Sequence, residues 1–114
     1  MSTSFGQALR ELRRSKNVTQ RNLAAQVGVD FSYISKVEND RLPPPSADTI
    51  MKICEVLSIP ADGLLSMTGK VPTPVRKMLG KSSAAQQFMQ QAHSLDLTEK
   101  EWRELTQNLK QLRS

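Results

Sequence analysis

Residues capable of nucleophilic or metal chemistry are scarce in this sequence of 114 residues. The chain has one cysteine, Cys54, and one histidine, His93, which lie far apart and outside any catalytic motif. One of each is too few for an ordinary zinc site and argues against a cysteine–histidine dyad. Cys54 instead repeats at helical spacing with Ile50, Ile53 and Leu57, which predicts a small core residue. We therefore expect no catalytic residue, no metal and no cofactor.

Carboxylates for acid–base catalysis are no better placed. Glu99, Glu101 and Glu104 fall on one short amphipathic segment, where they indicate a solvated helix face. An enzyme is the least favoured class of protein.

Basic side chains offer a different chemistry, the binding of phosphate. The net charge is +5, and the pI is near 9.7. Between positions 10 and 21 only Glu11 opposes a cluster of cations. For Arg10, Arg14 and Lys16, phosphate contact and simple solvent exposure both remain open. The cluster consists of Arg10, Arg13, Arg14, Lys16 and Arg21.

Size and composition restrict the fold to one domain or two very small ones. Aromatic residues make up only 4% of the chain, which argues against a β-sandwich or barrel. No apolar run is long enough to cross a membrane, and the first residues lack the apolar core of a secretory signal. A lone thiol suits a reducing compartment, so we expect a cytoplasmic protein.

Short helices with readable starts fill the sequence, which predicts an all-α fold. Ser4 with Gln7 and Thr98 with Glu101 match capping boxes. Four further polar residues are expected to cap helices, and Asn17 and Gly28 to end them. Val75, Met78 and Leu79 are expected to face inward from a short helix. The four expected caps are Thr19, Asp30, Ser46 and Ser82 or Ser83.

Proline and glycine divide the chain. Residues 43–45 are three prolines and predict an extended loop. Residues 68–74, with Gly69, Pro72 and Pro74, mark a candidate boundary. We expect a first domain over residues 1–68 and a helical C-terminal segment over residues 69–114.

Residues 19–39 combine a capped helix, a tight turn and a second capped helix. The small Ala24 allows the two helices to approach closely, and Gly28 permits the sharp turn. Val29, Ile34 and Val37 are expected to hold the second helix against the first. This pattern is typical of a helix-turn-helix, which presents a short exposed helix to the major groove of DNA.

At these residues the chain resembles the XRE, or lambda-repressor-like, helix-turn-helix family. The resemblance extends over residues 5–67 and implies a five-helix DNA-binding domain. Asp40 departs from the glycine that the family often has after the third helix, but aspartate tolerates a left-handed conformation. The matching residues are Leu9-Arg10 and Arg13, Thr19-Gln20, Leu23-Ala24, Val27-Gly28-Val29, residues 33–39, Pro45-Ser46, Thr49-Ile50 and Leu64-Leu65.

The resemblance implies that residues 30–39 form the recognition helix. Phe31, Ser32, Ser35 and Lys36 would then read base edges, with Lys36 donating to guanine. Phe31 has two open roles, packing on thymine methyl groups or folding into the core. The residues implied to contact the DNA backbone are Thr19, Gln20, Arg21, Tyr33 and Arg41. For Tyr33, packing on the loop before Ser46 is the alternative.

Arg13 and Glu38 occupy positions that pair in relatives of this family. The resemblance implies a structural salt bridge between the first helix and the end of the recognition helix, so Arg13 is not expected to read bases.

The C-terminal segment carries an apolar seam at the spacing of a helix–helix contact. Its residues are Trp102, Leu105, Leu109 and Leu112. The overall plan resembles short two-part regulators in which a helical tail dimerises or receives an antagonist protein. Folding of the seam back onto the first domain is the competing interpretation.

The leading hypothesis is a transcriptional regulator, more often a repressor in this family, that binds an inverted repeat in double-stranded DNA as a homodimer. Such a protein is expected to be associated with the nucleoid when it is bound to DNA. The alternative is an antitoxin-type or adaptor protein whose C-terminal helices bind a protein partner, such as a toxin or an antagonist.

Overall fold

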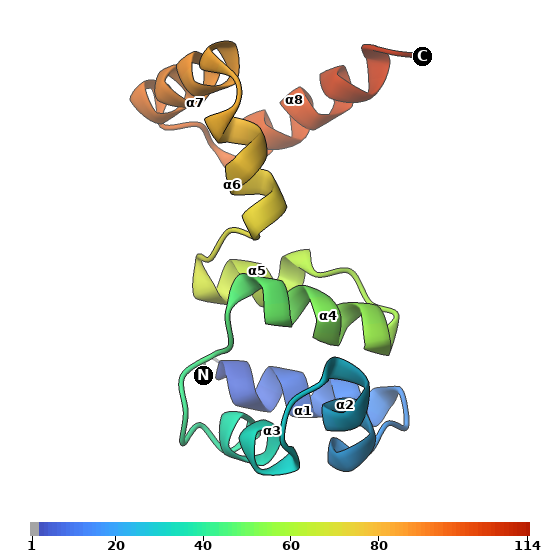
Figure 1. The fold of residues 1–114 in the computed structure, drawn as a ribbon. Coiled ribbons are helices and arrows are strands. Elements are labelled where there is room, and N and C mark those ends of the chain that lie inside the picture. Colours follow the sequence, from blue (N-terminus) through green and yellow to red (C-terminus); the bar gives the residue numbers. More distant parts are fainter. Residues whose placement is uncertain (1–2) are drawn as a thin grey trace. The chain divides into compact units, whose positions relative to one another are not determined.

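The computed structural model describes residues 3–114, and within that range it contains helices and no strand. This confirms the all-α fold. None of the helices in the described range is long and apolar enough to cross a membrane. Figure 1 labels the helices in chain order, and their bounds are α1 Phe5–Ser15, α2 Gln20–Val27, α3 Phe31–Glu38, α4 Ala47–Leu57, α5 Asp62–Thr68, α6 Thr73–Gly80, α7 Ser83–Leu95 and α8 Glu99–Gln111.

The chain divides into two compact units, one ending at Arg76 and the other covering Lys77–Ser114. This division lies inside α6, later than the boundary expected after residue 68. The 1–68 and 69–114 division therefore stays a prediction about the functional parts of the chain.

The first unit is held together by a core that all of α1 to α5 share. Helix α2 packs against α3 and α4, α1 packs against α3 and α5, and α4 packs against α5. Cys54 lies within this core and is nearly inaccessible, as its apolar spacing predicts. Burial also raises the pKa of its thiol. The largest fully buried apolar residues of the core are Leu9, Leu23, Ile34, Ile50, Ile53 and Leu57.

Helix caps occur mainly where the sequence predicts them. The capping boxes at Ser4 and Thr98 are both present, and the hydroxyls of Thr19 and Ser46 accept the amides three residues on. Ser82, rather than Ser83, caps α7. Asp30 differs from its prediction, because its backbone is extended as in a cap but its side chain accepts no amide hydrogen.

Hydrogen bonds connect Thr73, the first residue of α6, to the start of α4, and the linker before α6 to the proline loop. Asp48 accepts hydrogen bonds from the Thr73 amide at 2.9 Å and from the Thr73 hydroxyl at 2.5 Å. The Lys70 ammonium donates to the carbonyls of Pro44 and Pro45 at 3.0 and 2.9 Å. Hydrogen bonds from Thr73 hold the pKa of Asp48 below its ordinary value. The proline loop and the linker are therefore fastened to each other.

The apolar residues of α6 do not face inward, which corrects the prediction for this helix. Val75 is 40% exposed and Met78 is 59% exposed, and only Leu79 is partly covered. The reason is that α6 takes part in none of the close helix pairings that build the core of α1 to α5. Amphipathic spacing predicted the helix correctly but not a partner to cover it.

Candidate nucleic-acid interface

The turn between α2 and α3 is made by Gly28 in a left-handed conformation, with φ at +89°. The amides of Gly28 and Val29 both donate to the Ala24 carbonyl, at 2.9 and 3.0 Å, which closes the end of α2. Ala24, Ile34 and Val37 are buried where the two helices meet. The sequence therefore builds a rigid helix-turn-helix whose second helix is α3 (Figure 1).

The C-terminal end of α3 is anchored by a buried ion pair between Arg13 and Glu38. The Arg13 Nε donates to Glu38 Oε2 at 2.6 Å and its Nη2 to Oε1 at 2.9 Å, a bidentate arrangement. Both residues are buried, with exposures of 7% and 1%. The Arg13 guanidinium also donates to the Val18 carbonyl at 2.8 Å. The pair that the family resemblance implies thus joins α1, the α1–α2 turn and α3.

Gln20 and Arg10 extend this anchor. The Gln20 amide donates to Glu38 Oε1 at 2.9 Å, and the Arg10 Nε lies 3.6 Å from the same oxygen. Burial raises the pKa of Glu38, but the hydrogen bonds from Arg13 and Gln20 and the charges of Arg13 and Arg10 outweigh it. The net pKa of Glu38 is therefore below its ordinary value, and the carboxylate stays ionised in the folded protein.

Arg10 has a role that sequence reasoning missed. Besides the ion pair, its guanidinium donates to the Glu38 carbonyl at 3.3 Å and to the Asn39 side-chain oxygen. The only available signal was that Arg10 lies one helical turn before Arg13, on the same face of α1. Arg10 is thus engaged with the end of α3, whereas Arg14 and Lys16 are exposed.

Asp40, at the position where the family often has glycine, fastens α3 to the start of α1. It adopts a left-handed conformation with φ at +58°. Its carboxylate accepts the Ser4 hydroxyl at 2.7 Å and the Gly6 amide at 3.2 Å. The anionic side chain therefore sits at the positive end of the α1 dipole. A side chain at Gly6 would collide with the carbonyls of Val37 and Glu38, which shows how closely the two helices approach.

The outward face of α3 is free by comparison. Ser32 and Lys36 are exposed, and Ser35 is half-buried. Neither Ser32 nor Lys36 makes a side-chain hydrogen bond or ion pair within residues 3–114. This face of α3 presents one hydroxyl and one ammonium that are available to a ligand.

Phe31 does not fold into the core. Its ring is 38% exposed, and the Arg21 guanidinium of α2 lies over it at 4.4 Å from the ring centroid. This distance is within the range of a cation–π interaction. The first residue of α3 and the second residue of α2 therefore form one exposed pair.

The remaining residues predicted to contact the DNA backbone come from several elements: Thr19 precedes α2, Gln20 begins it, Tyr33 lies in α3, and Arg41 follows α3. Thr19 and Arg41 are exposed, whereas the Gln20 side chain is committed to Glu38. The Thr19 hydroxyl accepts the Asn22 amide in the first turn of α2. The amides of Gln20 and Arg21 lack helical partners, as at every helix N-terminus, which suits an anion. Tyr33 is half-buried against the core, and this burial raises the pKa of its hydroxyl.

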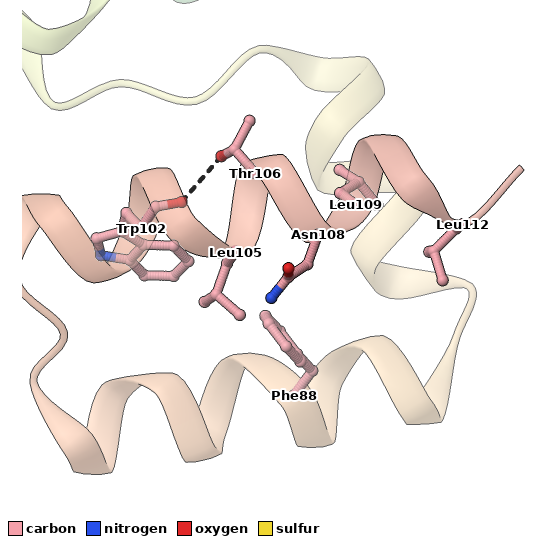
Figure 2. A pocket seen from close by; sticks show the side chains of 7 residues that line it. All are labelled: Phe88, Trp102, Leu105, Thr106, Asn108, Leu109 and Leu112. Atoms are coloured by element: carbon pink, nitrogen blue, oxygen red, sulfur yellow. Dashed lines mark hydrogen bonds between the residues drawn. The ribbon is translucent and has the colours of Figure 1, made fainter. Parts of the chain in front are cut away.

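The second unit contains an apolar groove between α7 and α8. The groove has a volume of about 340 Å³ and includes all four predicted seam residues. Figure 2 shows the Phe88 ring of α7 pointing toward Leu105 and Asn108 of α8. Leu109 and Leu112 remain 64% and 76% exposed, and Ala92 is the only buried residue described in this unit. The lining residues are Phe88, Trp102, Leu105, Thr106, Asn108, Leu109 and Leu112.

This fold and the free face of α3 define a helix-turn-helix DNA-binding module, and comparisons with known proteins agree. A helix-turn-helix family model matches residues 9–64. The HTH-type transcriptional repressor RghR of Bacillus subtilis is 40% identical over 68 residues, which are 60% of this chain and 50% of RghR. The HTH-type regulator RghRB of the same organism is 40% identical over 67 residues, or 59% of this chain and 48% of RghRB. The chain thus spans about half the length of these curated relatives.

Comparison with solved structures also finds similarity to DNA-binding regulators. The master regulator for biofilm formation SinR, in a crystal structure with DNA, is 31% identical with a TM-score of 0.50; the match covers 54% of this chain and 97% of that one. A SinR/SinI complex matches 96% of this chain and 97% of that chain at 24% identity and a TM-score of 0.51, which shows a shared fold.

The chain belongs to the XRE-type helix-turn-helix family of DNA-binding transcriptional regulators. This membership confirms the family resemblance and places the chain among regulators and not among enzymes.

Proposed function

We propose that this protein is a transcriptional repressor that binds an inverted-repeat operator in double-stranded DNA as a homodimer. The observation that carries the proposal is the rigid placement of α3. The buried Glu38 network holds its C-terminal end, and its exposed face presents Ser32 and Lys36 without competing partners. The likeness to SinR, a protein crystallised with DNA, supports the DNA-binding part of this proposal.

In this proposal the exposed face of α3 enters the major groove. Lys36 donates to guanine acceptors, and Ser32 and Ser35 complete the base contacts near Phe31. The first turn of α2, beginning after Thr19, binds one phosphate through the amides of Gln20 and Arg21. Arg41 and Tyr33 contact the DNA backbone on the other side and set the orientation of the helix.

The homodimer would form through the groove between α7 and α8. A single small module covers only one half-site, whereas two joined modules recognise a palindrome. The exposed side chains of Phe88, Leu109 and Leu112 supply apolar surface that the second unit leaves uncovered. The same surface supports the alternative proposal, an adaptor or antitoxin-type protein whose groove receives a helix of a toxin or an antagonist.

Selection of bound duplexes from a randomised DNA pool, at near-physiological salt, tests the main proposal. We expect an enriched inverted repeat, whose spacing reports the geometry of the dimer. Enrichment of a single half-site would contradict the dimer. Binding without any sequence preference, weakened uniformly by salt, would favour the adaptor or antitoxin-type protein.

Replacing Lys36 by alanine is expected to weaken binding to the selected operator by about 1–3 kcal/mol and to relax the preference at one base pair. The lost interaction is a direct donor to a base edge. Titration of operator duplexes carrying each base at each position measures both quantities. The matched variant Arg41→Ala should weaken all duplexes similarly, because it removes a phosphate contact. An unchanged base preference in Lys36→Ala would show that Lys36 does not read a base as proposed.

A further inference from the structure

Arg21 differs from the other exposed cations near α3 in having a fixed position. Its guanidinium carbon lies 4.4 Å from the centroid of the Phe31 ring. Among residues 3–114, the ion pairs belong to Arg10 and Arg13, and Arg21 makes neither an ion pair nor a side-chain hydrogen bond. The ring is therefore what orients Arg21, and its N–H donors have no partner in the protein.

A guanidinium lying over a ring keeps donors available at its edge. Five N–H groups in a planar fork match the O6 and N7 acceptors of guanine, the commonest specific contact in the major groove. The ring also lowers the conformational entropy that Arg21 loses on binding. A contact to phosphate needs no such orientation, because any mobile cation can supply it.

The position of the Arg21–Phe31 pair is consistent with a contact to a base. Phe31 is the first residue of α3 and precedes Ser32, at the end of a recognition helix that reaches base edges. Arg21 is therefore held beside the base-reading face of α3, although it belongs to α2.

We propose that Arg21 reads a guanine in the operator, and that Phe31 is the positioning residue that holds its guanidinium in place. This assigns Arg21 to the bases and not to the DNA backbone. Arg21 and Phe31 would then form one specificity unit contributed by both helices of the motif. The inference rests on the proposed DNA-binding function and deepens it.

The decisive variant is Arg21→Lys, which keeps the positive charge but removes the planar fork. In selections with the full-length protein, we expect the preference for guanine at one base pair to fall about tenfold or more. The slope of affinity against salt concentration should stay unchanged, because the number of cations is the same. Arg103→Lys, the same change on exposed α8, should alter neither quantity.

Phe31→Leu tests the positioning role, since leucine is apolar but offers no π face. It should relax the same base pair as Arg21→Lys, by about two- to fivefold. The double variant should lose little more than Arg21→Lys alone, because both changes remove one interaction. Circular dichroism and thermal melting check that these exposed substitutions leave the fold intact.

Three outcomes would overturn the inference. If Arg21→Lys keeps every base preference while Arg21→Ala weakens all duplexes equally, Arg21 binds a phosphate. If Phe31→Leu changes a different base pair from Arg21→Lys, Phe31 reads its own base. If the wild-type protein enriches no sequence at all, the proposed function itself fails, which separates that failure from the first two.

Discussion

Replacing Glu38 by glutamine should lower the free energy of unfolding by about 3 kcal/mol or more. The substitution preserves the shape of the side chain but leaves the guanidinium of Arg13, only 7% exposed, without its counter-charge. It also weakens the link from Gln20 at the start of α2 and from Arg10 on α1. Loss of this single charge therefore weakens contacts among three helices, α1, α2 and α3. Urea unfolding followed by circular dichroism measures the effect.

The matched control is Glu55→Gln, which changes an exposed glutamate on α4. We expect a change within about 0.5 kcal/mol, as for other surface substitutions. Equal destabilisation by the two variants would mean that overall charge, and not the buried network, determines the effect.

The same network predicts a dependence of stability on acid. The pKa of Glu38 is lower in the folded protein than its ordinary value, so the folded state binds its proton less readily than the unfolded state. The stabilisation is complete above the ordinary glutamate range and disappears as the pH falls through that range to the lowered pKa. Unfolding experiments over this interval should show wild type converging on Glu38→Gln. A constant gap between them at every acidic pH would contradict this origin.

The second large effect is expected in the C-terminal helices. Replacing both Leu105 and Leu109 by glutamate should convert a dimer into monomers, because four carboxylates would enter one apolar interface. Binding to a duplex with two half-sites should then fall about 100-fold or more, since the second module is no longer tethered to the first. Analytical ultracentrifugation and operator titration measure the two consequences separately.

Gln107→Glu with Gln111→Glu is the matched control, with the same spacing and added charge on exposed residues that do not line the groove. We expect this control to remain dimeric. An unchanged sedimentation mass in the leucine variant would contradict a homodimer that forms through this groove. If the wild-type protein is already monomeric, the result favours a different protein as the occupant of the groove.

Much of the DNA-binding domain was predictable because local rules and family resemblance agree there. Capping residues such as Ser4, Thr19 and Ser46 define where helices begin. Gly28 indicates a turn, because it adopts a left-handed conformation that other residues disfavour. Apolar spacing also identified the core, including Cys54. These signals act over a few residues, so a sequence displays them directly.

The details that sequence did not predict depend on distant residues or on the absence of a neighbour. The contact of Arg21 with Phe31 depends on how α2 meets α3, and the Asp40 carboxylate reaches back to Ser4 and Gly6. The spacing of apolar residues in α6 predicted burial, but Val75 remains exposed because no helix packs closely over it. Amphipathic spacing reports that one face is apolar, and only the fold decides whether anything covers it.

The anchored end of α3 has a consequence for how such a regulator can change during evolution. Stability resides in Glu38 and its partners, whereas the proposed base contacts come from Ser32, Lys36 and the Arg21–Phe31 pair. Because the two sets share no residue, substitutions that retarget the protein to a new operator carry little penalty in folding. Duplicated copies of this gene could therefore acquire separate target promoters by a few changes on the exposed surface of α2 and α3. The same separation makes the domain a suitable scaffold for engineering regulators with chosen operators.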